Sequence, residues 1–300
     1  MKFAVTGGAG FVGNNIVRLL VSKGHSVAII DNLHTGKKDN LEDVFEEIEF
    51  YQKDIRNYDE MEKILENVDG IFHEAALTIV QESFDKTEEY YDVNVKGTEN
   101  IFKIARKFKK KVVYASSSSI YGDSKQIPIK ENSIRNPINP YGQTKLEDEL
   151  LAEKYSNNGL DVIGLRYFNI FGKGQTGSYA GVITQFMRKL NEQKQPIIFG
   201  DGTQIRDFIH VSDIAEANLS AMLSKTNSGF FNIGTGVGTK IVDLAKIMIK
   251  IFNKEFEPIF HDSLKGDVKI SQANTVLTKK MINWESKIEL EEGLNKFILD

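Results

Sequence analysis

The fold of this 300-residue chain is predicted by one N-terminal stretch, Lys2-Phe3-Ala4-Val5-Thr6-Gly7-Gly8-Ala9-Gly10-Phe11-Val12-Gly13. A short apolar run leads into a glycine-rich turn, and an apolar stripe at helical spacing follows, made of Ile16, Val17, Leu20 and Val21. Gly24 ends that helix, residues 26–30 form a second apolar run, and Asp31 follows it. The order strand, glycine turn, helix, strand and acid is typical of a dinucleotide-binding unit.

Each glycine of this turn has a physical purpose in that unit. Gly7 permits the tight turn, Gly10 lets the backbone approach a pyrophosphate, and Gly13 lets the helix pack on the strand. The phosphates lie at the helix N-terminus, where free amides and the dipole favour anions. Asp31 would accept hydrogen bonds from the adenosine ribose and repel a 2′-phosphate, which favours NAD over NADP. The alternative is a plain turn with glycines for steric reasons.

A second pattern, Asn139-Pro140-Tyr141-Gly142-Gln143-Thr144-Lys145, predicts a helix that begins with an Asn cap and a first-turn proline. Tyr141 and Lys145 are four residues apart, so the phenol and the ammonium share one helix face. A cation beside a phenol favours the phenolate, which can serve as a general base. Alone, this spacing also arises by chance on exposed helices.

The glycine spacing G-x-x-G-x-x-G together with Tyr-x-x-x-Lys resembles the extended short-chain dehydrogenase/reductase family. Within it, the motifs are most similar to the NAD-dependent nucleotide-sugar epimerases, above all the UDP-glucose 4-epimerases. The matching motifs keep the family's order almost from end to end. The resemblance implies NAD as cofactor, bound by Gly7, Gly10, Phe11, Val12, Gly13, Asp31, Asn32, Asp54, Ile55, Ala75, Ala76, Asn94, Tyr141, Lys145 and Phe168.

The amino-acid composition limits the classes of partner that we expect for this chain. With 38 basic and 42 acidic residues, the formal net charge of −4 offers no general attraction to nucleic acid. No cysteine is present, hence no disulfide, thiol nucleophile or zinc-thiolate site, and we expect no metal. No apolar run reaches membrane-spanning length. We therefore expect a cytoplasmic enzyme without a membrane or nucleic-acid partner.

The predicted fold class is α/β, a Rossmann doubly wound parallel sheet with a smaller, discontinuous α/β substrate-binding domain. Strand and helix patterns alternate through Leu165, as parallel sheets with crossover helices require. The resemblance places the NAD-binding domain at 1–167 plus about 209–232, and the nucleotide-sugar-binding domain at 168–208 plus 233–300. It also implies a homodimer through helices around 87–108 and 140–155.

A serine run, Ser116-Ser117-Ser118-Ser119, follows an apolar strand and should lie at its carboxyl end, where open α/β sheets bind ligands. It could be only a hydrogen-bonded turn. The resemblance makes Ser117 the catalytic hydroxyl beside Tyr141 and Lys145, with Ser116 as the alternative register. Related dehydratases carry an Asp-Glu pair after this serine. Ser118 and Ser119 cannot shuttle protons near neutral pH, which argues against dehydration.

Substrate contacts are implied by later motifs. Asn169 and Arg206 match the family's diphosphate ligands, and a guanidinium suits phosphate through its planar fork of donors. An ion pair of Arg206 with Asp207 alone is the alternative, and His73 and His210 are expected to be structural. Leu264 replaces a second arginine, so adjacent Lys265 is the substitute. The predicted substrate-binding residues are Ser117, Asn169, Phe199, Arg206, Lys265 and Ser271.

The resemblance implies 4-epimerisation of a UDP-sugar through a 4-keto intermediate, with UDP-glucose and UDP-galactose as substrates. Ser271 stands where a bulky residue would exclude N-acetyl sugars, so UDP-N-acetylglucosamine is also expected to fit. Three alternatives stay open: a UDP-glucuronate 4-epimerase, a nucleotide-keto-sugar reductase that consumes NAD(P)H, and a non-catalytic NAD-binding regulator on the same fold.

Overall fold

The computed structural model describes residues 1–175, 181–264 and 267–299 and is built on a seven-stranded sheet. Its strand order is β10-β6-β5-β4-β1-β2-β3, and every neighbouring pair is parallel. The strands are β1 (Lys2–Thr6), β2 (Ser26–Ile30), β3 (Ile48–Tyr51), β4 (Gly70–His73), β5 (Lys111–Ser117), β6 (Val162–Tyr167) and β10 (Ser228–Ile233). The chain winds outward from β1 in both directions, so the predicted doubly wound fold is confirmed.

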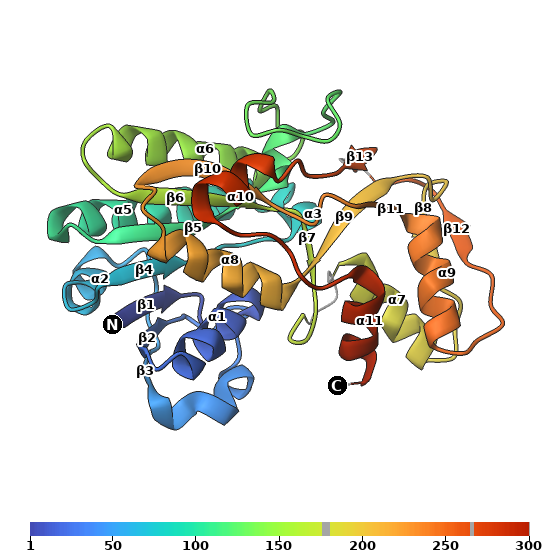
Figure 1. The fold of residues 1–300 in the computed structure, drawn as a ribbon, viewed down its shortest axis with the longest axis horizontal. Coiled ribbons are helices and arrows are strands. Elements are labelled where there is room, and N and C mark those ends of the chain that lie inside the picture. Colours follow the sequence, from blue (N-terminus) through green and yellow to red (C-terminus); the bar gives the residue numbers. More distant parts are fainter. Residues whose placement is uncertain (176–180, 265–266, 300) are drawn as a thin grey trace.

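Helices cover both faces of this sheet (Figure 1). One face carries α1 (Phe11–Ser22) and α8 (Val211–Leu223); the other carries α2 (Tyr58–Leu65), α5 (Gly97–Phe108) and α6 (Pro140–Ser156). Short turns of helix connect them: η1 (Lys38–Glu47), α3 (Val80–Ser83), α4 (Thr87–Tyr90), η2 (Tyr91–Lys96) and η3 (Ser118–Tyr121).

The alternation of side chains along the strands produces two separate cores. Phe3 and Val5 pack with Ile16 and Leu20 on the α1 side, whereas Ala4 packs with the α5 side. Strands β1 and β2 therefore bury side chains on both faces of the sheet. This is why the sequence shows continuous rather than alternating hydrophobic strands.

A second lobe lies at one end of the sheet (Figure 1). One small sheet joins β7 (Asn169–Phe171), β9 (Ile205–His210), β11 (Gly238–Lys240) and β13 (Ile270–Ser271), and β8 (Ile197–Phe199) pairs with β12 (Ile259–His261). Its helices are α7 (Val182–Asn191), α9 (Ile241–Ile251) and α11 (Leu290–Leu299), while α10 (Val276–Ile282) packs on α8 and β10. This lobe has its own core, which includes Phe186, Leu244 and Met248.

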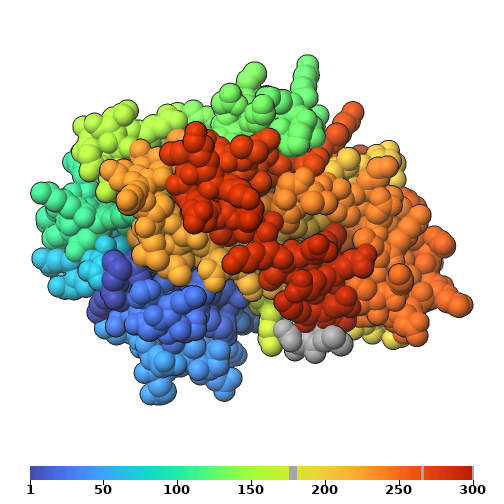
Figure 2. Space-filling view, viewed as in Figure 1, coloured from blue at the N-terminus to red at the C-terminus, as the bar shows by residue number. Residues whose placement is uncertain are grey.

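The chain crosses between the lobes more than once. After β6 it enters the second lobe, returns with α8 and β10, and leaves again with β11. Figure 2 shows the N-terminal residues in blue and the 240–260 region in orange on opposite sides of the molecule. We propose the domain division 1–167 plus about 209–232, and 168–208 plus 233–300.

Two kinds of feature are absent from the described residues. No helix there combines the length and apolar character needed to cross a bilayer. No group of three or more His, Cys, Asp and Glu side chains in those ranges is arranged to hold a metal ion.

Candidate active site

The glycine turn is closed by backbone contacts that leave no room for side chains at two positions. Gly7 has φ +67°, and a Cβ there would lie 2.8 Å from the nitrogen of Ala75; a Cβ on Gly13 would lie 2.1 Å from the Gly7 oxygen. At Gly10 such an atom would meet only the Gly7 oxygen, at 3.1 Å. The backbone beside Gly10 is therefore open, as the approach of a phosphate group requires.

Helix α1 begins at this open position without a side-chain cap. Gly10 is the N-cap residue and offers no side-chain acceptor, so the amides of Phe11 and Val12 precede the first intrahelical hydrogen bonds. These free donors and the helix dipole favour an anion at this point. The turn fits a dinucleotide pyrophosphate.

Asp31 connects the turn to the end of β2. Its Oδ2 accepts a hydrogen bond from the Ala9 amide at 3.0 Å, and its Oδ1 accepts one from the Leu33 amide at 2.8 Å. Burial raises the pKa of Asp31, and the two amide donors oppose that rise. A carboxylate has about four acceptor positions, so capacity remains for the hydroxyls of a ribose.

Three polar side chains meet beside the turn, where the resemblance predicts the adenine. Asn32 donates to Asp54 at 2.9 Å, and Arg56 binds the same carboxylate through Nε and Nη2 at 2.9 and 2.8 Å. The Arg56 guanidinium holds the pKa of Asp54 well below its usual range. Ile55 is buried and would contact a side chain placed at Gly97. The motif prediction did not include Arg56.

The loop after β4 is held by buried polar contacts. The ring nitrogens of His73 lie 2.7 Å from the Thr6 hydroxyl and 2.8 Å from the Thr98 hydroxyl, and burial lowers the pKa of His73 to about 3. This neutral ring joins β1, β4 and α5, in line with the expected structural role. Ala75 and Ala76 follow it and are partly exposed at the turn.

Asn94 anchors the same loop from the helical side. Its Oδ1 accepts from the Leu77 amide at 2.8 Å, and its Nδ2 donates to the Leu77 carbonyl and the Thr144 hydroxyl, both at 3.0 Å. The side chain is fully buried. The structure therefore shows Asn94 as a link between the cofactor loop and α6.

Helix α6 begins as its sequence predicts. Asn139 is the N-cap and accepts from the Gly142 amide at 2.8 Å, with Pro140 in the first turn. Tyr141 is partly exposed, whereas Lys145 is buried and donates to the Ala115 carbonyl at 3.0 Å. Burial opposes the ammonium, but the negative charge of Asp148 and the interaction with Tyr141 raise the pKa of Lys145.

The serine run lies at the carboxyl end of β5, and the two candidate serines face different surroundings. Ser116 donates to Glu149 at 2.7 Å inside the α6 layer. The Ser117 hydroxyl accepts from the Ser119 amide at 3.1 Å, and Ser117 pairs with Tyr167 across β5 and β6. Successive strand residues point to opposite faces, so only one of the two hydroxyls can face the cofactor side.

The sequence did not predict a group of three hydrogen-bonded side chains, Glu74, Tyr167 and Asn218. Tyr167 donates to the carboxylate of Glu74 at 3.0 Å and accepts from Asn218 at 2.8 Å. Burial raises the pKa of Glu74 to about 7, and the Tyr167 hydrogen bond opposes that rise. Glu74 lies between His73 and Ala75, but Tyr167 and Asn218 lie 93 and 144 residues later along the chain, so only the fold brings the three together.

In the second lobe, called the lid below, Arg206 is buried and already paired. Its guanidinium forms an ion pair with Asp267 and donates to the Val268 carbonyl at 2.7 Å. The alternative pair with Asp207 is wrong, because that carboxylate accepts from the amides of Thr235, Gly236 and Ala273 instead.

The other predicted substrate residues that the structure describes lie on strands of the second lobe: Asn169 on β7, Phe199 on β8 and Ser271 on β13. Asn169 donates to the Asp207 carbonyl at 3.2 Å, and buried Ser271 is the β13 register partner of Arg206. Phe199 is 37% exposed on β8, whereas Phe168 is buried in a cluster with Ile120 and Tyr121. Lys265 lies outside the described residues.

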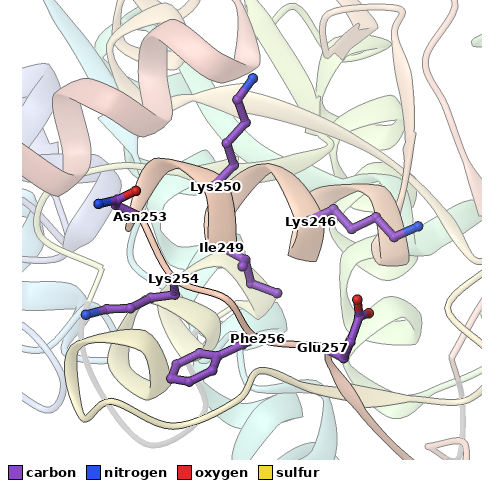
Figure 3. Close-up of a pocket in the computed structure, with 7 residues that line it drawn as sticks. All are labelled: Lys246, Ile249, Lys250, Asn253, Lys254, Phe256 and Glu257. Atoms are coloured by element: carbon purple, nitrogen blue, oxygen red, sulfur yellow. The ribbon is translucent and has the colours of Figure 1, made fainter.

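Two hollows lie outside this centre. One, before and at the start of α2, is lined by Asp54, Arg56, Asn57, Tyr58 and Asp59. Figure 3 shows the other, along α9 and the loop after it, which none of the predicted site residues lines; its residues are Lys246, Ile249, Lys250, Asn253, Lys254, Phe256 and Glu257.

Comparison with known proteins agrees with this geometry. Residues 3–234 match the family model described as the NAD dependent epimerase/dehydratase family. The chain is 33% identical to a UDP-glucuronate 4-epimerase of Thermodesulfobacterium geofontis, over 99% of this chain and 94% of that protein.

Two solved structures superpose on nearly the whole chain. One is a UDP-glucose 4-epimerase of Thermotoga maritima with UDP-glucose (TM-score 0.95, 34% identity, 100% of this chain and 98% of that one). The other is a UDP-N-acetylglucosamine 4-epimerase of Methanobrevibacter ruminantium in complex with UDP-N-acetylmuramic acid (TM-score 0.95, 34% identity, 99% and 97%). The chain is therefore an NAD-dependent enzyme that belongs to the NAD dependent epimerase/dehydratase family, in the extended short-chain dehydrogenase/reductase group.

Proposed function

We propose that this enzyme interconverts the 4-epimers of a UDP-sugar, with UDP-glucose and UDP-galactose as its principal substrates. The observation that carries this proposal is the convergence of β5 and α6. Ser117 ends β5 close to Ala115, and the Ala115 carbonyl holds the ammonium of Lys145, one helical turn from Tyr141. The end of β5 that carries Ser117 and the start of α6 that carries Tyr141 and Lys145 thus pack together at the carboxyl edge of the sheet.

Each of these three groups has a distinct task. Tyr141 as phenolate accepts the proton of the sugar 4-hydroxyl and returns it later. Lys145 favours the phenolate by its charge and reaches the nicotinamide ribose, and Ser117 hydrogen-bonds the reacting oxygen. NAD, held by the Gly7–Gly13 turn and Asp31, supplies reversible hydride acceptance at the sugar 4-position. The substrate passes through a 4-keto sugar, whose two faces must both become accessible for epimerisation.

The residues around the trio support epimerisation over elimination. Ser118 and Ser119 form the turn η3 directly after Ser117 and carry no carboxylate. Proton transfer in a dehydration needs an acid and a base of suitable pKa at the neighbouring carbons. Of the other carboxyls described at this site, Asp148 is paired with Lys145 and Glu74 is engaged by Tyr167.

At the nucleotide end, we propose Arg206 and Asn169 as diphosphate ligands. Leu264 stands where the family has a second arginine, and we propose that Lys265 takes over that role. Arg206 must then turn part of its donor fork from Asp267 to the phosphates. Phe199 is proposed to contact the substrate, and Phe168 is proposed to contact NAD. The small side chain of Ser271 leaves room beside the sugar 2-position, so UDP-N-acetylglucosamine joins the proposed substrates.

A second candidate is a UDP-glucuronate 4-epimerase, because a relative of that name shares 33% identity over 99% of the chain. A keto-sugar reductase is separated by stoichiometry, since it consumes NAD(P)H while an epimerase regenerates its cofactor. We also propose a homodimer through α5 and α6, where Leu150 is 48% exposed; light scattering of the purified protein tests this.

The decisive experiment offers the purified protein a panel of UDP-sugars and reads the epimer ratios by NMR. We expect UDP-glucose and UDP-galactose to reach equilibrium without net NADH formation. Tyr141→Phe should lower turnover by roughly a hundredfold or more and leave bound NAD unchanged. A Tyr141→Phe enzyme with most of its activity would exclude the proposed base.

The sugar 2-position is tested separately with Ser271→Tyr. The added ring should abolish turnover of UDP-N-acetylglucosamine and spare UDP-galactose, because only the former carries the bulky acetamido group. Ser271→Ala is the matched control and should retain both activities. If the wild-type enzyme turns over UDP-galactose but not the N-acetyl sugar, the steric proposal is wrong while the epimerase proposal stands.

A further inference from the structure

The ammonium of Lys145 is held from one side by two acceptors. Nζ donates to the Ala115 carbonyl at 3.0 Å and to Oδ2 of Asp148 at 3.2 Å, one turn further along α6. Lys145 is 3% exposed and Asp148 fully buried. Ion pairs of this kind are shielded little by solvent, so Asp148 acts strongly on the charge that Lys145 presents.

Asp148 is not otherwise satisfied. Within the described part of the chain, its Oδ1 has no hydrogen-bond partner. An unpaired buried carboxylate oxygen costs stability, and a nonpolar residue at this helix position would avoid that cost. Among the described residues, the hydrogen bond and the ion pair that the structure shows for this carboxylate are both with the ammonium of Lys145.

The other charges nearby do not replace this pair. Arg166 on β6 is held by both oxygens of Glu149 at 2.8 Å, so its charge is compensated there. The titratable groups that act on Asp148 or on Lys145 are Glu147 and Glu149 on α6, Tyr141 at its start, Tyr114 on β5, and His73 and Glu74 at the end of β4.

We propose that Asp148 is a positioning residue for the epimerisation: its carboxylate holds the Lys145 ammonium at the Ala115 carbonyl and offsets part of the ammonium's charge at Tyr141. This inference rests on the proposed function of Tyr141 as the base. Its consequence is that Asp148 determines how acidic the medium must become before the phenolate is lost.

The direction of the effect follows from the charges. Burial raises the pKa of Asp148 to about 7, against the opposing pull of Lys145. As the pH falls through that value the carboxyl becomes neutral, and the full charge of Lys145 then acts on Tyr141. The positive charge that acts on Tyr141 is therefore larger in acid than it would be beside a permanent carboxylate, so the protonation of Asp148 is coupled to catalysis.

The test is the pH dependence of kcat/KM for UDP-galactose between pH 5 and 9, with wild-type and Asp148→Asn holoenzymes. Asparagine preserves the shape and removes the charge. We expect the acid limb of the variant to move down by about one pH unit and to follow a one-proton curve, whereas the wild-type limb is shallower. The two enzymes should converge in acid and differ above about pH 7.

Asp213→Asn is the matched control. Asp213 is a buried carboxylate on α8 that accepts from the amides of Lys287 and Ile288, so its loss should lower stability and leave the acid limb in place. An Asp148→Asn enzyme with normal NAD content and an unshifted limb overturns the proposal.

Two further measurements keep the proposal open to refutation. Asp148→Ala should shift the limb in the same direction if the asparagine variant does not fold, and a one-proton limb in the wild-type enzyme refutes the coupling by itself. Failure of the proposed function is distinguishable, because it appears as retained activity in Tyr141→Phe whatever the Asp148 variants do.

Discussion

The cofactor side and the lid side of the site are built differently. Around the glycine turn, positions are determined by backbone contacts, such as the one between Gly13 and Gly7, and by Asp31, which joins the turn to β2. On the lid, the predicted phosphate ligand Arg206 is a side chain already engaged by Asp267 and by the Val268 carbonyl. The cofactor side is therefore shaped by the fold itself, whereas Arg206, if it binds phosphate as proposed, would exchange partners to do so.

Because of this difference, substitutions at the glycine turn and substitutions on the lid should have different effects. A backbone-built turn tolerates almost no added atom, because nothing around it can rotate away. A side-chain ligand can be weakened in steps, since its neighbours can adjust. We therefore expect changes on the cofactor side to affect folding and NAD together, and changes on the lid to affect KM alone.

The largest effect is expected for Gly13→Ala. The new Cβ would lie 2.1 Å from the Gly7 oxygen and 2.7 Å from the Gly8 Cα, and both are backbone atoms. We expect the free energy of unfolding to fall by about 1–3 kcal/mol and the protein to lose bound NAD. Thermal unfolding and the absorbance of released cofactor measure both.

Gly24→Ala is the control for Gly13→Ala. Gly24 has φ +75° but nothing within 4 Å of an added Cβ, so only backbone strain of about 1–2 kcal/mol is expected, with NAD retained. A Gly13→Ala protein with a full complement of NAD would break the contrast between the two sides.

Next in size is Arg206→Lys on the lid. A lysine keeps the charge but loses the fork of donors, and one lost charged hydrogen bond is worth about 1.5–3 kcal/mol. We expect KM for the UDP-sugar to rise roughly tenfold to a hundredfold, with little change in kcat or in NAD content. Steady-state kinetics provide the measurement.

Arg188→Lys is the matched change, because Arg188 is exposed on α7 and is not among the predicted ligands. It should leave KM unchanged. If Arg206→Lys lowers kcat and spares KM, the arginine does not bind the substrate in its ground state, and its assignment as diphosphate ligand fails.

The last effect concerns the stability of the cofactor side in acid. The pKa of His73 is lowered to about 3 in the fold, from an ordinary value near 6.5. The unfolded chain therefore binds the proton more readily, and the stability that neutral His73 contributes is present above about pH 6.5 and lost as the pH falls toward 3. The loss has a limiting slope of about 1.4 kcal/mol per pH unit.

His73→Gln removes this titration, so its unfolding free energy should fall less between pH 7 and 5 than that of the wild type. Glu74 and Asp148 act in the opposite sense, because burial raises the pKa of each, so the comparison must be made against the variant. His261→Gln, at an exposed site, should behave as wild type. Parallel pH profiles for wild type and His73→Gln would refute the buried neutral ring.

The sequence by itself determined the features that depend on near neighbours. The Gly7–Gly13 turn, the Asn139 cap of α6 and the end of β5 at Ser117 follow from local sterics and hydrogen bonding, and the structure shows each where it was predicted. Arg206 was recognised by its motif, but its pairing with Asp267 was not, because that partner lies 61 residues away.

Tertiary structure alone decided which charges act on the reaction centre. The packing of α6 against β5 buries Asp148 beside Lys145. The ends of β4 and β6 bring Tyr167 to Glu74, and α8 brings Asn218 to Tyr167. Burial and the choice of a distant partner are properties of the packed chain. Local propensity therefore specified the turn, the helix start and the strand end that carry the proposed trio, and long-range packing specified the charges around them.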